Sequence, residues 1–239
     1  MQSTEPEVLL VDAGNTFVKV GAVEGERVKL VRALPTKEVL KGPEALAELL
    51  KGKEVAVASV VPAVSELIRK VSPGALFVEA DKELPVKINY QGQMGADRVA
   101  NILGAYSLFK SFVVASVGTA VVVDAVVKGE FRGGVILPGL ELMAGALNKG
   151  TALLPRVKGV RRKPGRKTEE CIRAGIFRAV EGAIKTVREE FGGLPLILTG
   201  GAGELFREVL GGIYLRELTL LGIFEYWKLK RGRELPQIG

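Results

Sequence analysis

The chain has 239 residues, of which 47% are apolar and 26% charged, and 34 Lys and Arg against 27 Asp and Glu give a formal net charge of +7. It has no histidine and one cysteine, Cys171, so an internal disulfide, a zinc–cysteine cluster and histidine-based catalysis are excluded. No apolar run is long enough to span a bilayer, and the polar, acidic residues 1–7 do not resemble a secretion signal, which predicts a cytoplasmic protein.

Strands come first along the chain and then alternate with helices. We predict strands at 8–11, 17–23, 27–33, 55–58 and 75–78, helices at 43–51, 63–71 and 97–109, and a short extended piece at 84–90. Tight turns join the first three strands, which indicates an antiparallel meander, whereas the later alternation of strands with helices favours parallel pairing.

The second half of the chain repeats this plan. Strands are predicted at 112–116, 120–127, 130–136 and 195–199, and helices at 140–148, 169–191, 204–210 and 219–231. We therefore expect an α/β protein of two lobes, residues 1–110 and residues 111–239, that pack together with a cleft between them.

The start of the chain recurs weakly in its middle, at an offset of 104 positions. The aligned pairs are Gly14 with Gly118, Gly25 with Gly129 and Glu26 with Glu130. A repeat at this spacing is too long for a solenoid and suits two similar lobes. In each copy a strand leads into a glycine turn, whose backbone N–H groups can approach a ligand closely. Two such turns facing each other are suited to binding a polyphosphate.

The first glycine turn, residues 12–16, carries polar side chains at the end of a predicted strand. Asp12 is a candidate Mg²⁺ ligand, directly or through water, because hard cations prefer oxygen ligands. Asn15 and Thr16 are candidate donors to phosphate oxygens, and Lys19 on the next strand either reaches phosphate or is solvated. The alternative is an ordinary polar β-turn, which Asp, Gly and Asn all favour.

The second glycine turn offers Gly118 and Thr119 as candidate phosphate ligands through backbone N–H groups and the Thr119 hydroxyl, with a plain hairpin turn as the alternative. Two glycine-rich stretches, 133–139 and 199–203, follow strands, and we interpret both as strand-to-helix junctions. Each either passes beneath a nucleotide or permits close helix–sheet packing, which favours the second lobe as the seat of the adenosine.

Gly95-Ala96-Asp97-Arg98 opens a predicted helix. Asp97 is a candidate general base for a hydroxyl of an acceptor substrate, and Arg98, with its forked donors, is a candidate partner of a substrate carboxylate. The alternative for Asp97 is a helix N-cap, a role that stabilises a helix by about 1 kcal/mol.

Two further features are interpreted as structural. Cys171 falls inside a predicted helix with no histidine to activate it, so we expect a small buried residue. The basic run 161–167 has no interleaved aromatic residues, so a solvated loop is favoured over a nucleic-acid platform.

Together these motifs resemble the type III pantothenate kinases of the acetate/sugar kinase–Hsp70–actin superfamily. The matching pieces run in order along the chain at 12–16, 59–62, 89–90, 95–98, 118–120, 133–139, 199–201 and 218–222. The resemblance implies two duplicated actin- or ribonuclease-H-like lobes, each a mixed sheet flanked by helices, with the active site in the cleft between. It also implies ATP-dependent phosphorylation of the primary hydroxyl of pantothenate to 4′-phosphopantothenate, the first step of coenzyme A biosynthesis.

The resemblance further implies residue roles. Asp97 is similar to the family's catalytic base, and Asp12 to a residue near its Mg²⁺. Pantothenate contacts correspond to Tyr90, Gly95, Ala96, Arg98 and Thr168, and ATP contacts to Asp12, Ala13, Gly14, Asn15, Thr16, Lys19, Gly118 and Thr119. Family members are homodimers, with the Thr168 position near the interface, and they need Mg²⁺ and usually a monovalent cation. In phosphoryl transfer the protein mainly positions groups and stabilises charge, so a histidine-free site suffices.

One departure from the family pattern lies in the second turn. Ser116 stands where the family has an Asp associated with the monovalent cation, and Val121 and Val122 stand where it has threonines. A hydroxyl cannot supply that charge, which leaves open a requirement for K⁺ or NH₄⁺. The departure motivates an alternative function, a binding or regulatory protein that has lost turnover. A nucleic-acid binder is a third hypothesis, indicated by net charge alone.

Overall fold

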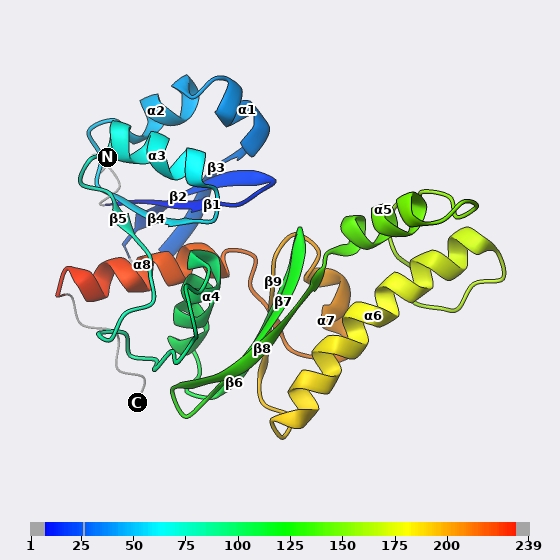
Figure 1. The fold of residues 1–239 in the computed structure, drawn as a ribbon. Helices are drawn as coiled ribbons and strands as arrows, with labels where there is room; N and C mark the ends of the chain where they lie inside the picture. The colour runs from blue at the N-terminus through cyan, green and yellow to red at the C-terminus, as the bar shows by residue number, and fades with distance from the viewer. Residues whose placement is uncertain (1–7, 26, 233–239) are drawn as a thin grey trace. The chain divides into compact units, whose positions relative to one another are not determined.

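Residues 8–25 and 27–232 are described by the structure, a computed structural model. Within these ranges the chain forms two compact units, one from residues 8–110 together with 217–232 and the other from residues 111–216. Each unit contains one five-stranded sheet with helices packed against it (Figure 1). No helix in the described ranges has both the length and the apolar character needed to cross a membrane.

The first unit is built on a mixed sheet in the order β3-β2-β1-β4-β5. Its elements are β1 (Leu9–Ala13), β2 (Phe17–Glu24), β3 (Arg27–Pro35), α1 (Thr36–Lys41), α2 (Glu44–Leu50), β4 (Val55–Ser59), α3 (Pro62–Val71), β5 (Leu76–Phe77), α4 (Ala96–Tyr106) and α8 (Leu218–Lys230). β1, β2 and β3 pair antiparallel, whereas β4 and β5 join in parallel. The predicted meander followed by parallel strands is therefore confirmed.

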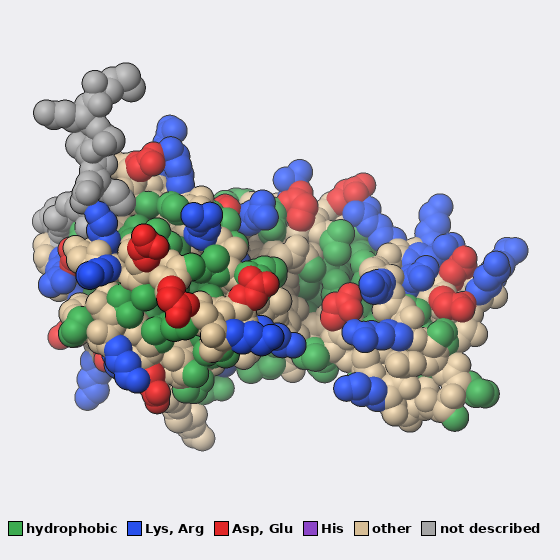
Figure 2. Space-filling view, turned by 90° about the horizontal axis from the view of Figure 1, so that it is seen from above, with side chains coloured by type: hydrophobic (Ala, Val, Ile, Leu, Met, Phe, Trp, Pro, Cys, Tyr) green, Lys and Arg blue, Asp and Glu red, His purple; other side chains and the backbone are tan. Residues whose placement is uncertain are grey.

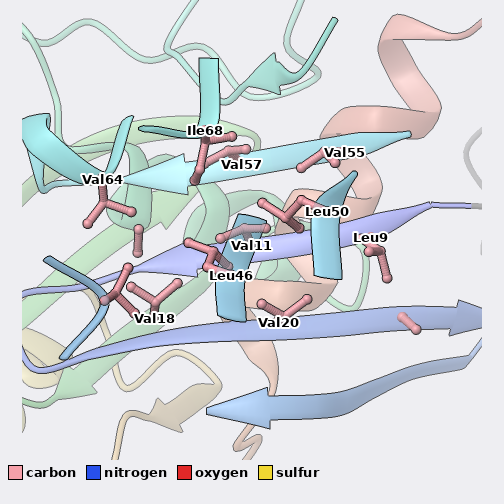
Figure 3. Close-up of a cluster of buried hydrophobic side chains, with 13 residues drawn as sticks. Leu9, Val11, Val18, Val20, Leu46, Leu50, Val55, Val57, Val64 and Ile68 are labelled. Atoms are coloured by element: carbon pink, nitrogen blue, oxygen red, sulfur yellow. The ribbon is translucent and has the colours of Figure 1, made fainter. Parts of the chain in front are cut away.

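Helices α1, α2 and α3 cover one face of this sheet, and α4 and α8 lie on the other (Figure 1). Successive side chains of a strand point to opposite faces, so Leu9 and Val11 of β1 face the α1–α3 side. There they join a core that Figure 3 shows, whose larger labelled members are Leu9, Val11, Val18, Val20, Leu46, Leu50, Val55, Val57, Val64 and Ile68. By the same alternation Leu10 and Asp12 face the side covered by α4 and α8.

The second unit repeats the strand order of the first, as β8-β7-β6-β9-β10. Its elements are β6 (Phe112–Val117), β7 (Ala120–Val127), β8 (Glu130–Pro138), α5 (Leu140–Gly150), α6 (Thr168–Glu190), β9 (Leu196–Thr199), α7 (Glu204–Leu210) and β10 (Ile213–Tyr214). The two meanders close through turns in which Gly25 and Gly129 have φ angles of 65° and 74°. Glu26, aligned with Glu130 in the repeat, lies outside the described residues.

The end of the chain corrects the predicted division into residues 1–110 and 111–239. Helix α8 belongs with the first unit, not the second, because its apolar residues pack on that unit's sheet and on α4. Leu220, for example, is 1% exposed and lies against Gly21 of β2. Chain order places α8 after the second unit, and only tertiary packing reveals that it returns to the first.

Several local expectations also change. Helix α1 and strand β10 were not predicted because both are too short to show a periodic pattern. Residues 84–90 contain no strand beyond a single bridge at Lys87. Gly133 and Gly134 lie inside β8, opposite an irregularity in β7, so a strand-to-helix junction at that point is wrong. Only Gly139, the N-cap of α5, stands at the junction.

Two surface features complete the fold. Cys171 is exposed in the first turn of α6, so the expectation of a buried cysteine is wrong. In the basic loop, Arg162 pairs with Glu208 at 2.6 Å and Arg161 with Glu170 at 3.5 Å. Figure 2 shows basic side chains interspersed with acidic ones on the face in view, as expected for a solvated surface.

Candidate active site

Asp97 lies at the start of α4, where backbone N–H groups without helical partners converge. Its Oδ1 accepts a hydrogen bond from the backbone N–H of Arg98 at 2.9 Å. The N-cap of α4 is Gly95, so the alternative interpretation of Asp97 as the N-cap is wrong. A side chain at Gly95 would meet the Asp97 carboxylate at 2.7 Å, which explains why glycine suits this position.

Asp12 lies near the end of β1, on the same face of the sheet as α4. Its partner across the β1–β2 ladder is Lys19, and Lys19 Nζ lies 3.4 Å from Asp12 Oδ2. The Asp12 side chain is 12% exposed, so the sheet and its covering helices shield the carboxylate from most of the solvent.

Burial raises the pKa of both carboxyl groups. Burial raises the pKa of Asp97 above its ordinary value, and the backbone N–H and positive charge of Arg98 oppose part of that rise. Burial likewise raises the pKa of Asp12, the Lys19 ammonium lowers it, and repulsion from Asp97 adds to the rise. A carboxylate with a raised pKa is a stronger base, which suits Asp97 to accept a hydroxyl proton.

The first glycine turn connects Asp12 to the surface. Gly14 N donates to Phe17 O at 3.0 Å and closes the turn, while Asn15 and Thr16 are exposed at its tip. The Thr36 hydroxyl donates to Gly14 O at 2.6 Å. The sequence reasoning missed Thr36, because its partner lies 22 residues away and no local pattern links them.

The Arg98 side chain contacts Tyr90, another of the predicted pantothenate contacts. The Arg98 side chain is buried, lies 5.0 Å from the centre of the Tyr90 ring, and donates to the Tyr90 hydroxyl at 3.3 Å. The aromatic face stabilises the guanidinium in this partly desolvated place. The structure thus brings Tyr90 close to the segment from Gly95 to Arg98 in the first unit.

The second glycine turn is enclosed by glycines from two other segments. Gly118 N donates to Ala120 O at 2.9 Å, and both Gly118 and Thr119 are exposed. A side chain on Gly139 would overlap the carbonyl oxygen atoms of this turn, and one on Gly200 would lie 2.5 Å from Val117 O. The predicted junction at 199–203 therefore lies beside the second turn within the same unit.

Ser116 occupies the place in the second turn that Asp12 has in the first. It lies opposite Val122 on one side and Thr199 on the other. The Thr199 hydroxyl is buried and has no hydrogen-bond partner among the described residues. The second turn consequently carries a hydroxyl group and an apolar neighbour, Val122, where the first turn carries the Asp12 carboxylate and the Lys19 ammonium.

Metal binding rests on few protein ligands. Within residues 8–25 and 27–232, no three His, Cys, Asp or Glu side chains are grouped as a metal cluster. Mg²⁺ at phosphate-transfer sites keeps several waters and is bound by one or two carboxylates plus the substrate phosphates. A shielded Asp12 carboxylate beside an exposed glycine turn fits that mode of binding. Thr168, the remaining predicted substrate contact, is exposed as the first residue of α6 in the second unit.

Comparison with known proteins identifies the family. The family model for type III pantothenate kinase matches residues 8–190, more than half of the chain. The chain belongs to the type III pantothenate kinase family. Members of this family phosphorylate pantothenate in the first step of coenzyme A biosynthesis. Type III pantothenate kinases of Fervidobacterium nodosum and Aromatoleum aromaticum are 32% and 35% identical to it, over 94% and 90% of this chain and 98% and 96% of theirs.

Solved structures confirm the predicted fold. A putative Baf family transcriptional activator from Campylobacter jejuni aligns with a TM-score of 0.68 at 20% identity, over 94% of this chain and 99% of its own. The ParM protein of pSK41 aligns with a TM-score of 0.53 at 10% identity, over 95% and 98%. At these identities the likeness concerns the fold alone. It is the duplicated actin-like α/β fold that the type III pantothenate kinase resemblance implies.

Proposed function

We propose that the protein transfers the γ-phosphoryl group of ATP to the primary hydroxyl of pantothenate, with Asp97 as the base. The observation that carries this role is the half-buried Asp97 carboxylate at the start of α4. Burial raises its pKa, and the backbone of its own helix orients it. Asp97 would accept the hydroxyl proton as the oxygen attacks phosphorus, and ADP would leave.

Arg98 and Tyr90 are proposed to recognise pantothenate. A guanidinium is suited to a carboxylate because its donors form a planar fork, and pantothenate carries one carboxylate. The contact between Arg98 and the Tyr90 ring holds that fork in place. Gly95 and Ala96 would contact the substrate through the backbone beside Asp97, and Thr168 completes the proposed set.

ATP is proposed to bind through its phosphates to both glycine turns. In the first turn the contacts would be Ala13, Gly14, Asn15, Thr16 and Lys19, and in the second they would be Gly118 and Thr119. Asp12 would hold Mg²⁺ directly or through water, since a hard cation prefers oxygen ligands. When bound, the ion neutralises charge on the phosphates during transfer.

The residues of the second turn affect whether turnover requires a monovalent cation. Ser116 supplies a neutral hydroxyl where the family has a carboxylate, and its cross-strand neighbours Val122 and Thr199 add no charge. We therefore propose turnover that depends on Mg²⁺ and only weakly on K⁺ or NH₄⁺. Comparing rates in K⁺ with rates in tetramethylammonium at equal ionic strength measures this, and strict dependence on K⁺ would contradict it.

A homodimer is part of the proposal. The second unit exposes large apolar side chains along β8, α5 and the loop that follows, namely Val135, Ile136, Leu142, Leu147 and Leu153. Leu153 is 92% exposed, which is costly for a side chain of this size unless something covers it. Light scattering on the wild type and on Leu153→Lys checks whether a second copy of the chain covers Leu153.

We also place the reaction in the cytoplasm, where ATP is supplied.

The test is product formation from ATP and pantothenate with Mg²⁺, followed by ³¹P NMR. Asp97→Asn keeps the shape of the side chain and removes the base, so we expect a loss of roughly 100-fold to 10,000-fold in kcat. Glu66→Gln, an exposed carboxylate-to-amide change on α3 of the same unit, is the matched control and should retain activity. Near-normal turnover by Asp97→Asn would contradict the assigned base. A folded wild type without turnover would favour the binding or regulatory alternative.

A further inference from the structure

Helices α4 and α8 cross with their backbones in direct contact. A side chain on Gly222 of α8 would overlap the carbonyl group of Ala100 on α4. A side chain on Gly104 of α4 would lie 2.7 Å from Leu218 O and 3.1 Å from Gly222 N. Glycine on both helices therefore permits a crossing that any larger residue would push apart. The position of α4 is fixed closely by that of α8.

A part-buried hydrogen bond connects the same two helices one residue beyond Ala100. The Thr219 hydroxyl donates to Asn101 Oδ1 at 2.9 Å, and Asn101 is 5% exposed. Asn101 follows Asp97 by four residues, so the two side chains lie on one face of the helix, a turn apart. This bond thus links α8 to the face of α4 that carries Asp97.

Asp97 depends on its helix for its orientation. The hydrogen bond described for its carboxylate comes from the backbone N–H of Arg98, not from a side chain of another element. Any shift of the first turn of α4 therefore moves the carboxylate with it. Interactions that fix α4 also fix Asp97.

Helix α8 contacts the strand side of the site as well. Leu220 lies between Thr219 and Gly222 in sequence, and it packs against Gly21 of β2, two residues beyond Lys19. Helix α8 also packs on β1, the strand that carries Asp12. One helix is therefore in contact with the helix that carries Asp97 and with the strands that carry Asp12 and Lys19.

We infer that Thr219 and Gly222 are positioning residues for Asp97, acting through Asn101 and through the backbone of Ala100. The inference rests on the proposed role of Asp97 as the base and extends it to α8, which contributes no group to the reaction itself. In this arrangement α8 sets the distance between the base and the phosphate-binding strands. Misplacing a reacting group by about 1 Å can cost roughly 100-fold in rate, so a small shift of α4 has a large effect.

The main variant is Thr219→Val, which removes the hydroxyl and keeps the shape of the side chain. We expect kcat to fall roughly 10-fold to 100-fold with the KM for ATP unchanged, and Thr219→Ser to restore most of the rate. Ser72→Ala is the matched control, because the Ser72 hydroxyl makes a buried hydrogen bond to Leu50 O in the same unit, and neither residue belongs to α4 or α8. If Thr219→Val and Ser72→Ala lower Tm equally and both keep kcat, Thr219 is merely structural and the inference is wrong.

A double variant separates positioning from general damage. Because Thr219 acts through Asp97, the double variant of Asp97→Asn with Thr219→Val should lose no more than Asp97→Asn alone. If the losses in kcat of the two single variants multiply in the double variant, the inference is wrong, but the role of Asp97 as the base still stands. Gly222→Ala should lose more activity than Thr219→Val, and its control is Gly182→Ala, at a helical glycine with open space around it. Gly222→Ala with normal kcat would contradict a fixed crossing.

A measurement without turnover distinguishes failure of the inference from failure of the proposed function. Carbon-13 NMR of the carboxyl groups follows the titration of Asp97 directly. Burial raises its pKa in the wild type, so a shifted α4 in Thr219→Val should let that pKa fall toward its ordinary value, while Ser72→Ala leaves it unchanged. An unchanged titration in Thr219→Val would overturn the inference even in an active kinase. If the pKa of Asp97 falls in Thr219→Val but the wild type has no kinase activity, the link between Thr219 and Asp97 holds and the proposed phosphoryl transfer is wrong.

Discussion

The two glycine turns share a backbone plan and differ in charge. In the first, Asp12 stands across the ladder from Lys19, whereas in the second Ser116 stands across from Val122. Strand order and the glycine of the following turn are the same in both units. The fold therefore forms without the acid–base pair, so the pair in the first turn is best explained by its ligand. Function lies in side chains placed on a shared scaffold.

Among substitutions that compare the two turns, we expect the largest effect on activity at Asp12 and a much smaller one at the matched position Ser116. Asp12→Asn should lower kcat/KM by roughly 100-fold, because the charge stabilisation that Mg²⁺ supplies depends on this ligand. Ser116→Ala should change it by less than about threefold, since a neutral hydroxyl holds a cation weakly. Steady-state kinetics at saturating pantothenate measures both. Equal losses at the two positions would remove the functional difference between the turns.

The Asp12→Asn variant should also be more stable than the wild type at neutral pH. Burial disfavours the charged form of this carboxyl group, so a neutral amide of the same shape removes that cost. A thermal unfolding scan checks the direction of the change in Tm.

Placing an acid in the second turn should be costly. Ser116→Asp introduces a carboxylate between Val122 and Thr199, neither of which carries a charge, and we expect a loss of about 1–3 kcal/mol in the free energy of unfolding. Urea unfolding measures the loss, and K⁺ should recover part of it together with a K⁺-stimulated rate. Ser116→Asn is the neutral control. A Ser116→Asp protein as stable as wild type would show that charge does not distinguish the turns.

Removing the Lys19 ammonium beside Asp12 should shift the pH dependence of both activity and stability. Lys19 lowers the pKa of Asp12, so Lys19→Met raises that pKa further and moves the acid limb of kcat/KM to higher pH. A group whose pKa is raised on folding favours the native state fully below its unfolded value, here 3.8, and loses that contribution as pH rises through the folded value. Stability should therefore fall more with rising pH in Lys19→Met. Lys29→Met, at an exposed pair with Glu24, is the control for lost charge.

We expect the smallest effects, on the free energy of unfolding, at the glycine turns that both units share. Gly25→Ala and Gly129→Ala should each cost about 1 kcal/mol, because both glycines have positive φ, which strains any side chain. Open space surrounds Gly25, so overlap adds nothing to the cost there. Gly74→Ala, with open space and no positive φ, is the control. Urea unfolding that shows a cost at only one of the two turns would contradict their equivalence.

The sequence predicted the repeated part of the fold well, because alternating strands and glycine turns are local signals. Strand β7 and helix α7 begin and end at the predicted residues. Asp97 and Arg98 stood out as candidates because they open a predicted helix after Gly95, whereas Tyr90 was named only through the family resemblance. What the sequence could not show was non-local, such as the Thr36 bond to Gly14 and the return of α8 to the first unit.

The return of α8 also affects the order in which the protein can fold. A ribosome releases residues 111–216 before it releases α8, so the second unit has its whole sequence available while the first still lacks a helix. Until then the face of β1 that carries Leu10 and Asp12 has no α8 to cover it. Contacts between the two ends of the chain form slowly, because a long loop must close first. The unit made first is thus the last to be completed, and a nascent chain cut short before α8 leaves it exposed to aggregation.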